Sequence, residues 1–174
     1  MRRRMDGSEW RSGAAALLLF ALGWLALGGA VGGGFVHFDD DLYVFNNPHV
    51  LSGLTGPGVR WAFTTGHAGN WHPLTWLSLM ADTEWCRGEA WGYHATNVAL
   101  HALNGVLLFL ALRRWTGRWG LPLAAAALWT AHPLRVESVA WISERKDVLA
   151  MFFGLLALWT YGGNAAGTAG GRGR

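Results

Sequence analysis

The residues best suited to chemistry in this chain are three adjacent carboxylates, Asp39, Asp40 and Asp41. Three neighbouring negative charges repel one another, so at least one is expected to hold a proton or a nearby cation more readily than an isolated aspartate. Such a carboxylate can act as a general base, and a set of carboxylate oxygens can bind a hard divalent metal ion. The alternative is a solvated acidic turn that contacts no ligand.

A second group of polar residues occurs further along the chain. It consists of His132, Arg135, Glu137, Glu144, Arg145, Lys146 and Asp147. If this segment is helical, Glu137 and Glu144 lie on one side of it with Trp141 between them. Most charged runs form a solvated surface, so a binding site and a solvated surface both stay open.

His72 lies between Trp71 and Pro73 in a polar segment and could bind a metal ion, but no Cys or His stands at a zinc-like spacing from it. Cys86 is the single cysteine, so a disulfide within the chain is excluded. Phosphate-binding loops, dinucleotide fingerprints and nucleophile elbows are also absent from the sequence.

Four polar residues recur every three or four positions in an apolar stretch, namely His94, Asn97, His101 and Asn104. This spacing places them on one face of a helix. Hydrogen bonds between helices are the preferred interpretation. Haem ligation would need a second histidine column, for which His132 alone is poor support.

The elements that must position these residues are membrane helices. Of the 174 residues, 52% are hydrophobic and 14% charged, against about 25% charged in soluble domains. Lys146 is the only lysine, and the arginines stand at the ends of apolar segments. That distribution excludes a nucleic-acid partner and indicates contact with a lipid bilayer. Twelve tryptophans fit an aromatic belt at the membrane surface.

Four apolar segments cover residues 13–31, 91–112, 119–134 and 148–161. The first is long enough to cross a hydrocarbon core of roughly 30 Å as a helix. Arg11 precedes the first segment and Arg113 follows the second, which places the amino terminus in the cytoplasm. A cleaved signal peptide is the alternative for the first segment. The expected fold is an all-α, multi-pass membrane protein with about four transmembrane helices.

The expected organisation has three parts. They are a basic cytoplasmic start at 1–12, a membrane domain at 13–161 with outer loops at 32–90 and 135–147, and a Gly/Arg tail without regular structure at 162–174. In the long loop, Pro57 and Pro73 each mark the first turn of a helix. Leu74, Leu77 and Ala81 then share one face, as in a helix lying at the membrane surface.

Several strings of residues match a known family in order. They are residues 35–41 (FVHFDDD), 46–48 (NNP), 61–65 (WAFTT), 70–78 (NWHPLTWLS), 94–97 (HATN), 101–104 (HALN), 132–141 (HPLRVESVAW) and 144–147 (ERKD). These strings resemble bacterial relatives of the TMTC proteins, which are transmembrane and tetratricopeptide-repeat O-mannosyltransferases of the GT-C class. The similarity extends over residues 35–161.

The resemblance implies transfer of a sugar, with mannose as the expected one, from a polyprenyl-phosphate carrier to a hydroxyl group of a protein or glycan, at the outer face of the bacterial inner membrane. Asp39 and Asp40 match the family's acidic pair, with Asp40 the first choice as base. Some members use a divalent metal ion, for which Asp39, Asp40 and Asp41 are the expected ligands. The candidate substrate-binding residues are His72, His132, Glu137, Arg145 and Asp147.

Family members continue through further membrane helices and tetratricopeptide repeats, so the resemblance implies an amino-terminal fragment. Two other functions stay open. One is a small non-catalytic membrane protein that serves as an anchor or assembly partner. The other is a haem or metal carrier that uses His94, His101 and His132.

Overall fold

The computed structural model describes the backbone of residues 7–170 and the side chains of residues 10–162. Its α-helices are α1 (Gly7–Leu27), α2 (Pro48–Leu51), α3 (Gly56–Thr64), α4 (Pro73–Cys86), α5 (Ala90–Thr116), α6 (Gly120–Thr130), α7 (Val136–Ala140) and α8 (Arg145–Gly170). Short 3-10 or π turns join them: η1 (Gly28–Gly32), η2 (Asp41–Phe45), η3 (His67–Gly69), η4 (Pro133–Arg135) and η5 (Ile142–Glu144). No strand occurs between residues 7 and 170, which confirms the all-α prediction.

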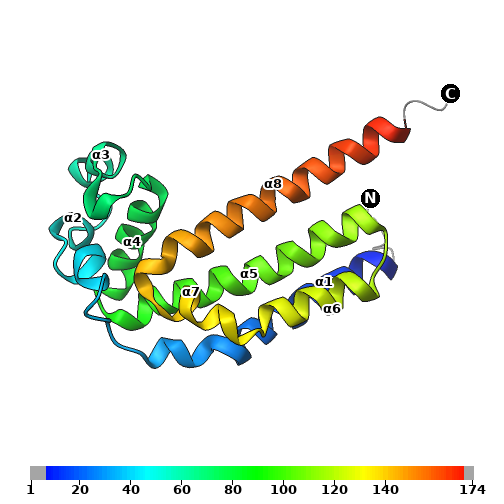
Figure 1. Ribbon diagram of the computed structural model, residues 1–174, viewed down its shortest axis with the longest axis horizontal. Helices are drawn as coiled ribbons and strands as arrows, with labels where there is room; N and C mark the ends of the chain where they lie inside the picture. The colour runs from blue at the N-terminus through cyan, green and yellow to red at the C-terminus, as the bar shows by residue number, and fades with distance from the viewer. Residues whose placement is uncertain (1–6, 171–174) are drawn as a thin grey trace, which may run out of the picture.

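The helix α5 is the centre of the structure. The helices α1, α6 and α8 run along it, and the short helices α2, α3 and α4 gather at the end where α5 begins (Figure 1). The helix α8 starts beside α5 and diverges from it towards the carboxyl terminus. The short helices of residues 48–86 therefore lie at one end of a helical bundle.

The polar face of α5 holds the surrounding segments in place. His94 donates to the carbonyl of Gly34 (3.3 Å), and His101 donates to that of Thr130 (2.9 Å). Asn97 donates to the carbonyl of Trp141 (3.1 Å), and Asn104 donates to that of Val148 (2.9 Å). All four side chains are buried. The predicted hydrogen bonds between α5 and its neighbours are confirmed.

Small residues let the helices approach closely. A Cβ added to Gly23 of α1 would lie 2.8 Å from the Cβ of Ala102 in α5. The glycine is therefore required for the contact between α1 and α5, as is common where helices pack in membranes.

The segment of residues 32–90 folds as a compact unit around a core of aromatic and aliphatic side chains. Its fully buried members include Val44, Val50, Trp76, Leu79, Met80 and Tyr93. The predicted helix starts are confirmed, because α3 contains Pro57 in its first turn and α4 begins at Pro73. Leu74, on the side of α4 predicted to face the membrane surface, is half exposed, and contact of that side with the membrane stays a prediction. Trp76, Leu79 and Met80 pack inward from the helix. The helix contacts a loop core on that side, which the spacing of apolar residues alone did not reveal.

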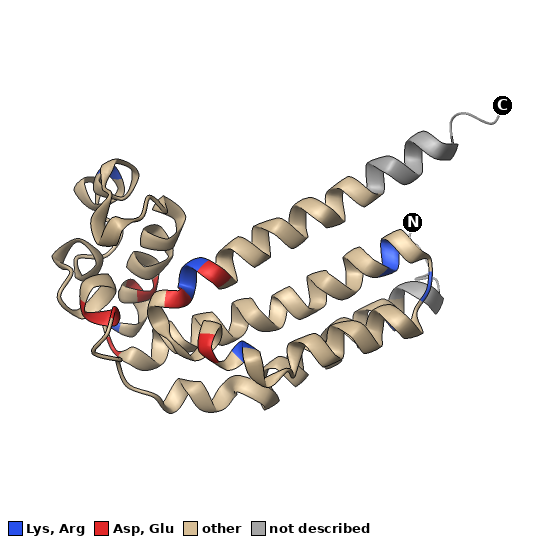
Figure 2. Cartoon of the chain, viewed as in Figure 1, with Lys and Arg blue, Asp and Glu red and all other residues tan. Residues whose placement is uncertain are grey.

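Two of the described helical segments, Trp10–Gly32 and Ala90–Thr116, are long and apolar enough to cross a membrane. Lys, Arg, Asp and Glu lie towards the two ends of the bundle, and the middle of its long helices carries none of them (Figure 2). These features indicate a membrane protein. The third expected span corresponds to the eleven-residue α6, and the fourth to α8, which begins earlier than expected and runs to Gly170. Four spans, and the cytoplasmic placement of residues 1–12, stay predictions; residues 1–6 and 171–174 lie outside the described part.

Candidate functional site

Asp40 joins the segment of residues 32–90 to the segment of residues 135–147. Its side chain is fully buried at the start of η2, where one carboxylate oxygen accepts a hydrogen bond from the amide of Val36 (2.9 Å). The other oxygen accepts from the amide of Ser143 in η5 (2.9 Å). The first loop and the segment before α8 are therefore fastened to each other through a single side chain.

Burial raises the pKa of Asp40 above its ordinary value, and the hydrogen bonds from Val36 and Ser143 oppose that shift in part. Both oxygens already have donors, and the side chain has no access to solvent. This environment favours a structural role for Asp40.

Asp39 has a different environment. It is half-buried, and among the described residues no hydrogen bond to its carboxylate is formed. Tyr43 lies close by: burial raises the pKa of the Tyr43 phenol, and the charges of Asp39 and Glu144 raise it further. Of the two acidic residues that the sequence favours, Asp39 is the one open to a ligand.

The third carboxylate, Asp41, is also half-buried. One of its oxygens is enclosed without a hydrogen-bond partner in the described structure. No group of three or more His, Cys, Asp or Glu side chains with the spacing of a metal site occurs between residues 10 and 162. A metal site built from Asp39, Asp40 and Asp41 thus has no geometric support here.

The start of α8 contributes a compact charged group. The ammonium of Lys146 lies 2.7 Å from a carboxylate oxygen of Glu144, and it faces the ring of Tyr43 at 5.5 Å. Burial, repulsion by Glu144 and a hydrogen bond that the protonated Asp147 donates to Glu144 all raise the pKa of Asp147. Lys146 thus lies near Tyr43 of the first loop and near two carboxylates of the second, Glu144 and Asp147. Of these two carboxylates, Asp147 is exposed.

His72 borders this charged group. Its ring lies 5.5 Å from that of Tyr43, and burial followed by the charge of Lys146 lowers its pKa. Its Nε2 atom is enclosed and has no hydrogen-bond partner among the described residues. The lowered pKa favours the neutral form of His72 beside Lys146.

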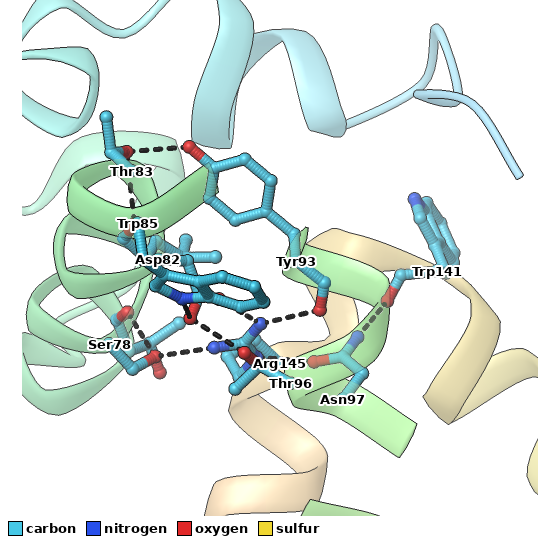
Figure 3. A network of polar contacts seen from close by, with 11 residues as sticks. Ser78, Asp82, Thr83, Trp85, Tyr93, Thr96, Asn97, Trp141 and Arg145 are labelled. Carbon is cyan, nitrogen blue, oxygen red and sulfur yellow. Dashed lines mark hydrogen bonds and ion pairs between the residues drawn. The ribbon is translucent and has the colours of Figure 1, made fainter. Parts of the chain in front are cut away.

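Arg145, a candidate for binding phosphate, is instead fully buried (Figure 3). Its guanidinium forms an ion pair with Asp82 of α4 (2.6 Å) and donates to the carbonyl of Tyr93 (2.9 Å). It also donates to Asn97 and Ser78. These contacts join α4, α5 and α8 and leave the guanidinium closed to a ligand, so we keep Arg145 out of the proposed substrate site.

Asp82 is a structural residue that reasoning from the sequence missed. It accepts hydrogen bonds from Thr96 (2.7 Å) and Trp85 (3.3 Å) in addition to its ion pair with Arg145. A buried aspartate among apolar residues of α4 was the available signal, because an acidic side chain in such a position needs a partner.

Glu137 and His132 lie apart from the charged group around Lys146. Glu137 is exposed and lines a shallow apolar pocket together with Phe38 and Trp141. His132 is exposed, and its Nδ1 accepts from the amide of Leu134 (3.2 Å) at the start of η4. The structure therefore gathers His72 and Asp147 of the five candidate binding residues around Lys146.

Two cavities open beside Asp147. We call the first the outer groove: it has a volume of about 670 Å³ and an apolar wall that includes Phe63, Trp71, Leu74, Leu149 and Phe153. Its charged or titratable members are His72, Lys146 and Asp147. We call the second the interhelical cavity: it has a volume of about 410 Å³ and lies among α5, α6, α7 and α8. Asp147 lines both cavities.

The chain is similar in sequence to several curated proteins. Protein O-mannosyl-transferase TMTC1 of Mus musculus and that of Homo sapiens are each 35% identical to it over 86% of its length. Protein O-mannosyl-transferase Tmtc2 of Drosophila melanogaster is 33% identical over 75% of the chain. The chain is a relative of the TMTC protein O-mannosyl-transferases.

The aligned part makes up 17% of the mouse TMTC1 protein and 18% of the human one, so the chain spans less than a fifth of the length of these relatives. No family model matches the chain, and no solved structure gives a significant match.

Proposed function

We propose that this chain supplies the outer loops of a membrane glycosyltransferase of the GT-C class, which transfers a sugar, in the first place mannose, from a polyprenyl-phosphate donor to a hydroxyl group. The acceptor hydroxyl belongs either to a Ser or Thr side chain of a protein or to a glycan. The observation that carries this proposal is the Asp40–Ser143 hydrogen bond, because it brings Asp39 and the Lys146 group to the same end of the bundle in a relative of the TMTC proteins.

Asp39 is the general base in this proposal. The acceptor oxygen forms a bond to the anomeric carbon of the sugar while the bond from that carbon to the phosphate oxygen breaks. The hydroxyl proton passes to the Asp39 carboxylate, and the electron pair of the broken bond leaves with the lipid phosphate. Lys146 stands where it can offset the charge that develops on that phosphate.

The outer groove suits the lipid part of such a donor. Its wall contains Phe63, Trp71 and Leu74 from the outer loop, all of which are half exposed or more. The polar members include His72, directly before α4, and Lys146, in the first turn of α8, so a lipid chain in the groove would bring its phosphate towards the Lys146 ammonium. Apolar surface of this kind favours a hydrocarbon ligand.

We further propose that the outer loops face the extracytoplasmic side of the bacterial inner membrane, with the amino terminus in the cytoplasm. The arginines at the opposite end of the bundle, Arg11, Arg113, Arg114 and Arg118, support that orientation.

Sealed membrane vesicles of both orientations test this proposal. The vesicles carry the protein and receive an acceptor peptide that cannot cross the bilayer, together with polyprenyl-phosphate mannose labelled in the sugar. We expect labelled peptide only with vesicles whose extracytoplasmic face points outward. Label incorporated only by the opposite orientation would refute the proposed face, and no incorporation in either would refute the transfer activity.

The second candidate is a non-catalytic membrane protein that acts as an anchor or assembly partner. The burial of Asp40 and Arg145 favours this candidate, since both charged side chains hold the fold together and neither is open to a substrate. This candidate predicts that Asp39→Asn leaves the glycans of envelope proteins unchanged. The glycosyltransferase proposal, with Asp39 as the general base, predicts that these glycans are lost.

A further inference from the structure

The interhelical cavity contains polar groups that the fold itself leaves unsatisfied. Its wall includes His101, Asn104, Trp129, Arg135, Ser138 and Asp147, together with apolar side chains of α7 and α8. Asn104 is fully buried, and its amide nitrogen donates to the carbonyl of Val148 (2.9 Å). That bond fixes the orientation of the amide, and the Asn104 Oδ1 atom has no hydrogen-bond partner among the described residues.

Arg135 provides the matching donor. Its Nε atom is also enclosed without a partner in the described structure, and its guanidinium faces the ring of Trp129 at 5.5 Å. Enclosed polar atoms without partners are rare in folded proteins, because each loses its hydrogen bonds to bulk water. An acceptor on Asn104 and a donor on Arg135 in one cavity indicate a ligand that both donates and accepts.

The composition of the wall narrows the class of ligand. An anion would meet the Asn104 oxygen and the Asp147 carboxylate, and a metal cation would meet the Arg135 guanidinium. A neutral ring with hydroxyl groups at its rim and C–H groups on its faces fits both the polar and the apolar residues of the wall. The hydroxyls can bond to Asn104 and Arg135, and Val139, Val148 and Met151 supply apolar contacts. A hexose has this character and fits within about 410 Å³.

Asp147 links this cavity to the outer groove, because it lines both. We propose that the interhelical cavity binds the hexose of the lipid-linked donor, with Asn104 and Arg135 as hydrogen-bond partners of its hydroxyls. This inference rests on the proposed function, which puts the lipid in the outer groove and the phosphate beside Lys146. The sugar then extends past Asp147 into the cavity.

Binding of two donors that differ only in the sugar tests the inference. The dissociation constants of polyprenyl-phosphate mannose and of the same polyprenyl phosphate without sugar are measured on the full chain in nanodiscs. We expect Asn104→Leu to weaken binding of the mannosyl lipid about fivefold, the usual effect of one lost hydrogen bond, and to leave binding of the sugar-free lipid unchanged. Leu103→Ala, at an exposed position of the same helix, is the control and should change neither constant.

Asp147→Asn is the second variant, because Asp147 is exposed and its substitution does not depend on repacking of the interior. It should also weaken the mannosyl lipid selectively. Equal constants for wild type and both variants, or an equal loss for both lipids, would overturn the cavity assignment. If the variants lose affinity for the mannosyl lipid alone and the protein transfers no sugar, the cavity assignment stands and the proposed function is refuted. If the protein transfers sugar and the variants do not distinguish the two lipids, the proposed function stands and the cavity assignment is refuted.

Discussion

The Asp40 carboxylate accepts a hydrogen bond from the backbone amide of Ser143, 103 residues further along the chain. The same carboxylate accepts from the amide of Val36, so it fixes both loops at once. Each hydrogen bond to a charged group contributes about 1.5–3 kcal/mol, and the cost of burying the charge offsets part of the sum. We expect Asp40→Ala to lower the free energy of unfolding by about 2 kcal/mol.

Unfolding of the protein in detergent, followed by circular dichroism, measures this effect. Asp41→Ala is the matched control, because Asp41 is the adjacent carboxylate and accepts no hydrogen bond in the described structure. Equal stability of the two variants would show that the Asp40–Ser143 link contributes nothing.

The buried pair of Arg145 and Asp82 gives a second prediction. Removing one partner of a buried pair leaves an uncompensated charge, which costs about 3–5 kcal/mol. We expect Arg145→Met to destabilise the protein by this amount, and Asp82→Leu in addition to Arg145→Met to restore part of the loss. Lys146→Met is the control: its pair with Glu144 is partly exposed and contributes less than about 1 kcal/mol. Additive effects of the Arg145 and Asp82 substitutions would contradict the pairing.

His72 gives a prediction about pH. Burial and the charge of Lys146 lower its pKa below the ordinary value of 6.5. The unfolded chain then takes up a proton on His72 at a higher pH than the folded chain does, so stability is lost as the pH falls below about 6.5. We expect the unfolding temperature to drop more between pH 7.5 and pH 5.5 in the wild type than in His72→Gln. The same drop in both would exclude His72 as a source of acid sensitivity.

Gly23 tests the packing of the bundle. A Cβ at this position would lie 2.8 Å from the Cβ and 2.9 Å from the Cα of Ala102, so α1 and α5 must move apart in Gly23→Ala. Overpacking of this kind costs about 1–3 kcal/mol. Gly13→Ala on the same helix meets nothing within 4 Å and should instead be neutral or slightly stabilising, because alanine favours the helix. Thermal unfolding of the two variants in detergent compares them directly, and destabilisation of both by the same amount would rule out the close contact.

The sequence predicted the parts of the fold that depend on local pattern. The helix starts at Pro57 and Pro73 follow from proline chemistry, and the spacing of His94, Asn97, His101 and Asn104 predicted a buried polar face because three- and four-residue intervals place side chains on one side of a helix. The inward face of α4 could not be predicted, since it depends on a loop core assembled from distant segments.

The roles of individual charged residues could not be predicted for the same reason. Asp39 and Asp40 are identical in type and adjacent, and they differ in burial and in the contacts of Asp40 with the amides of Val36 and Ser143. The planar guanidinium of Arg145 is suited to bind a phosphate. In the structure it instead forms a buried ion pair with Asp82, 63 residues away in the sequence. Long-range partners of this kind determine whether a charge is structural or open to a ligand.

The most direct measurement is the rate of mannose transfer from polyprenyl-phosphate mannose to an acceptor peptide by membranes that contain wild type, Asp39→Asn or Asp41→Asn. Loss of a general base lowers a rate by roughly 10²–10⁴-fold. We expect a loss of this size for Asp39→Asn, with unchanged thermal unfolding, and a rate within about threefold of wild type for Asp41→Asn. A wild-type rate for Asp39→Asn would contradict the assignment of Asp39 as the base.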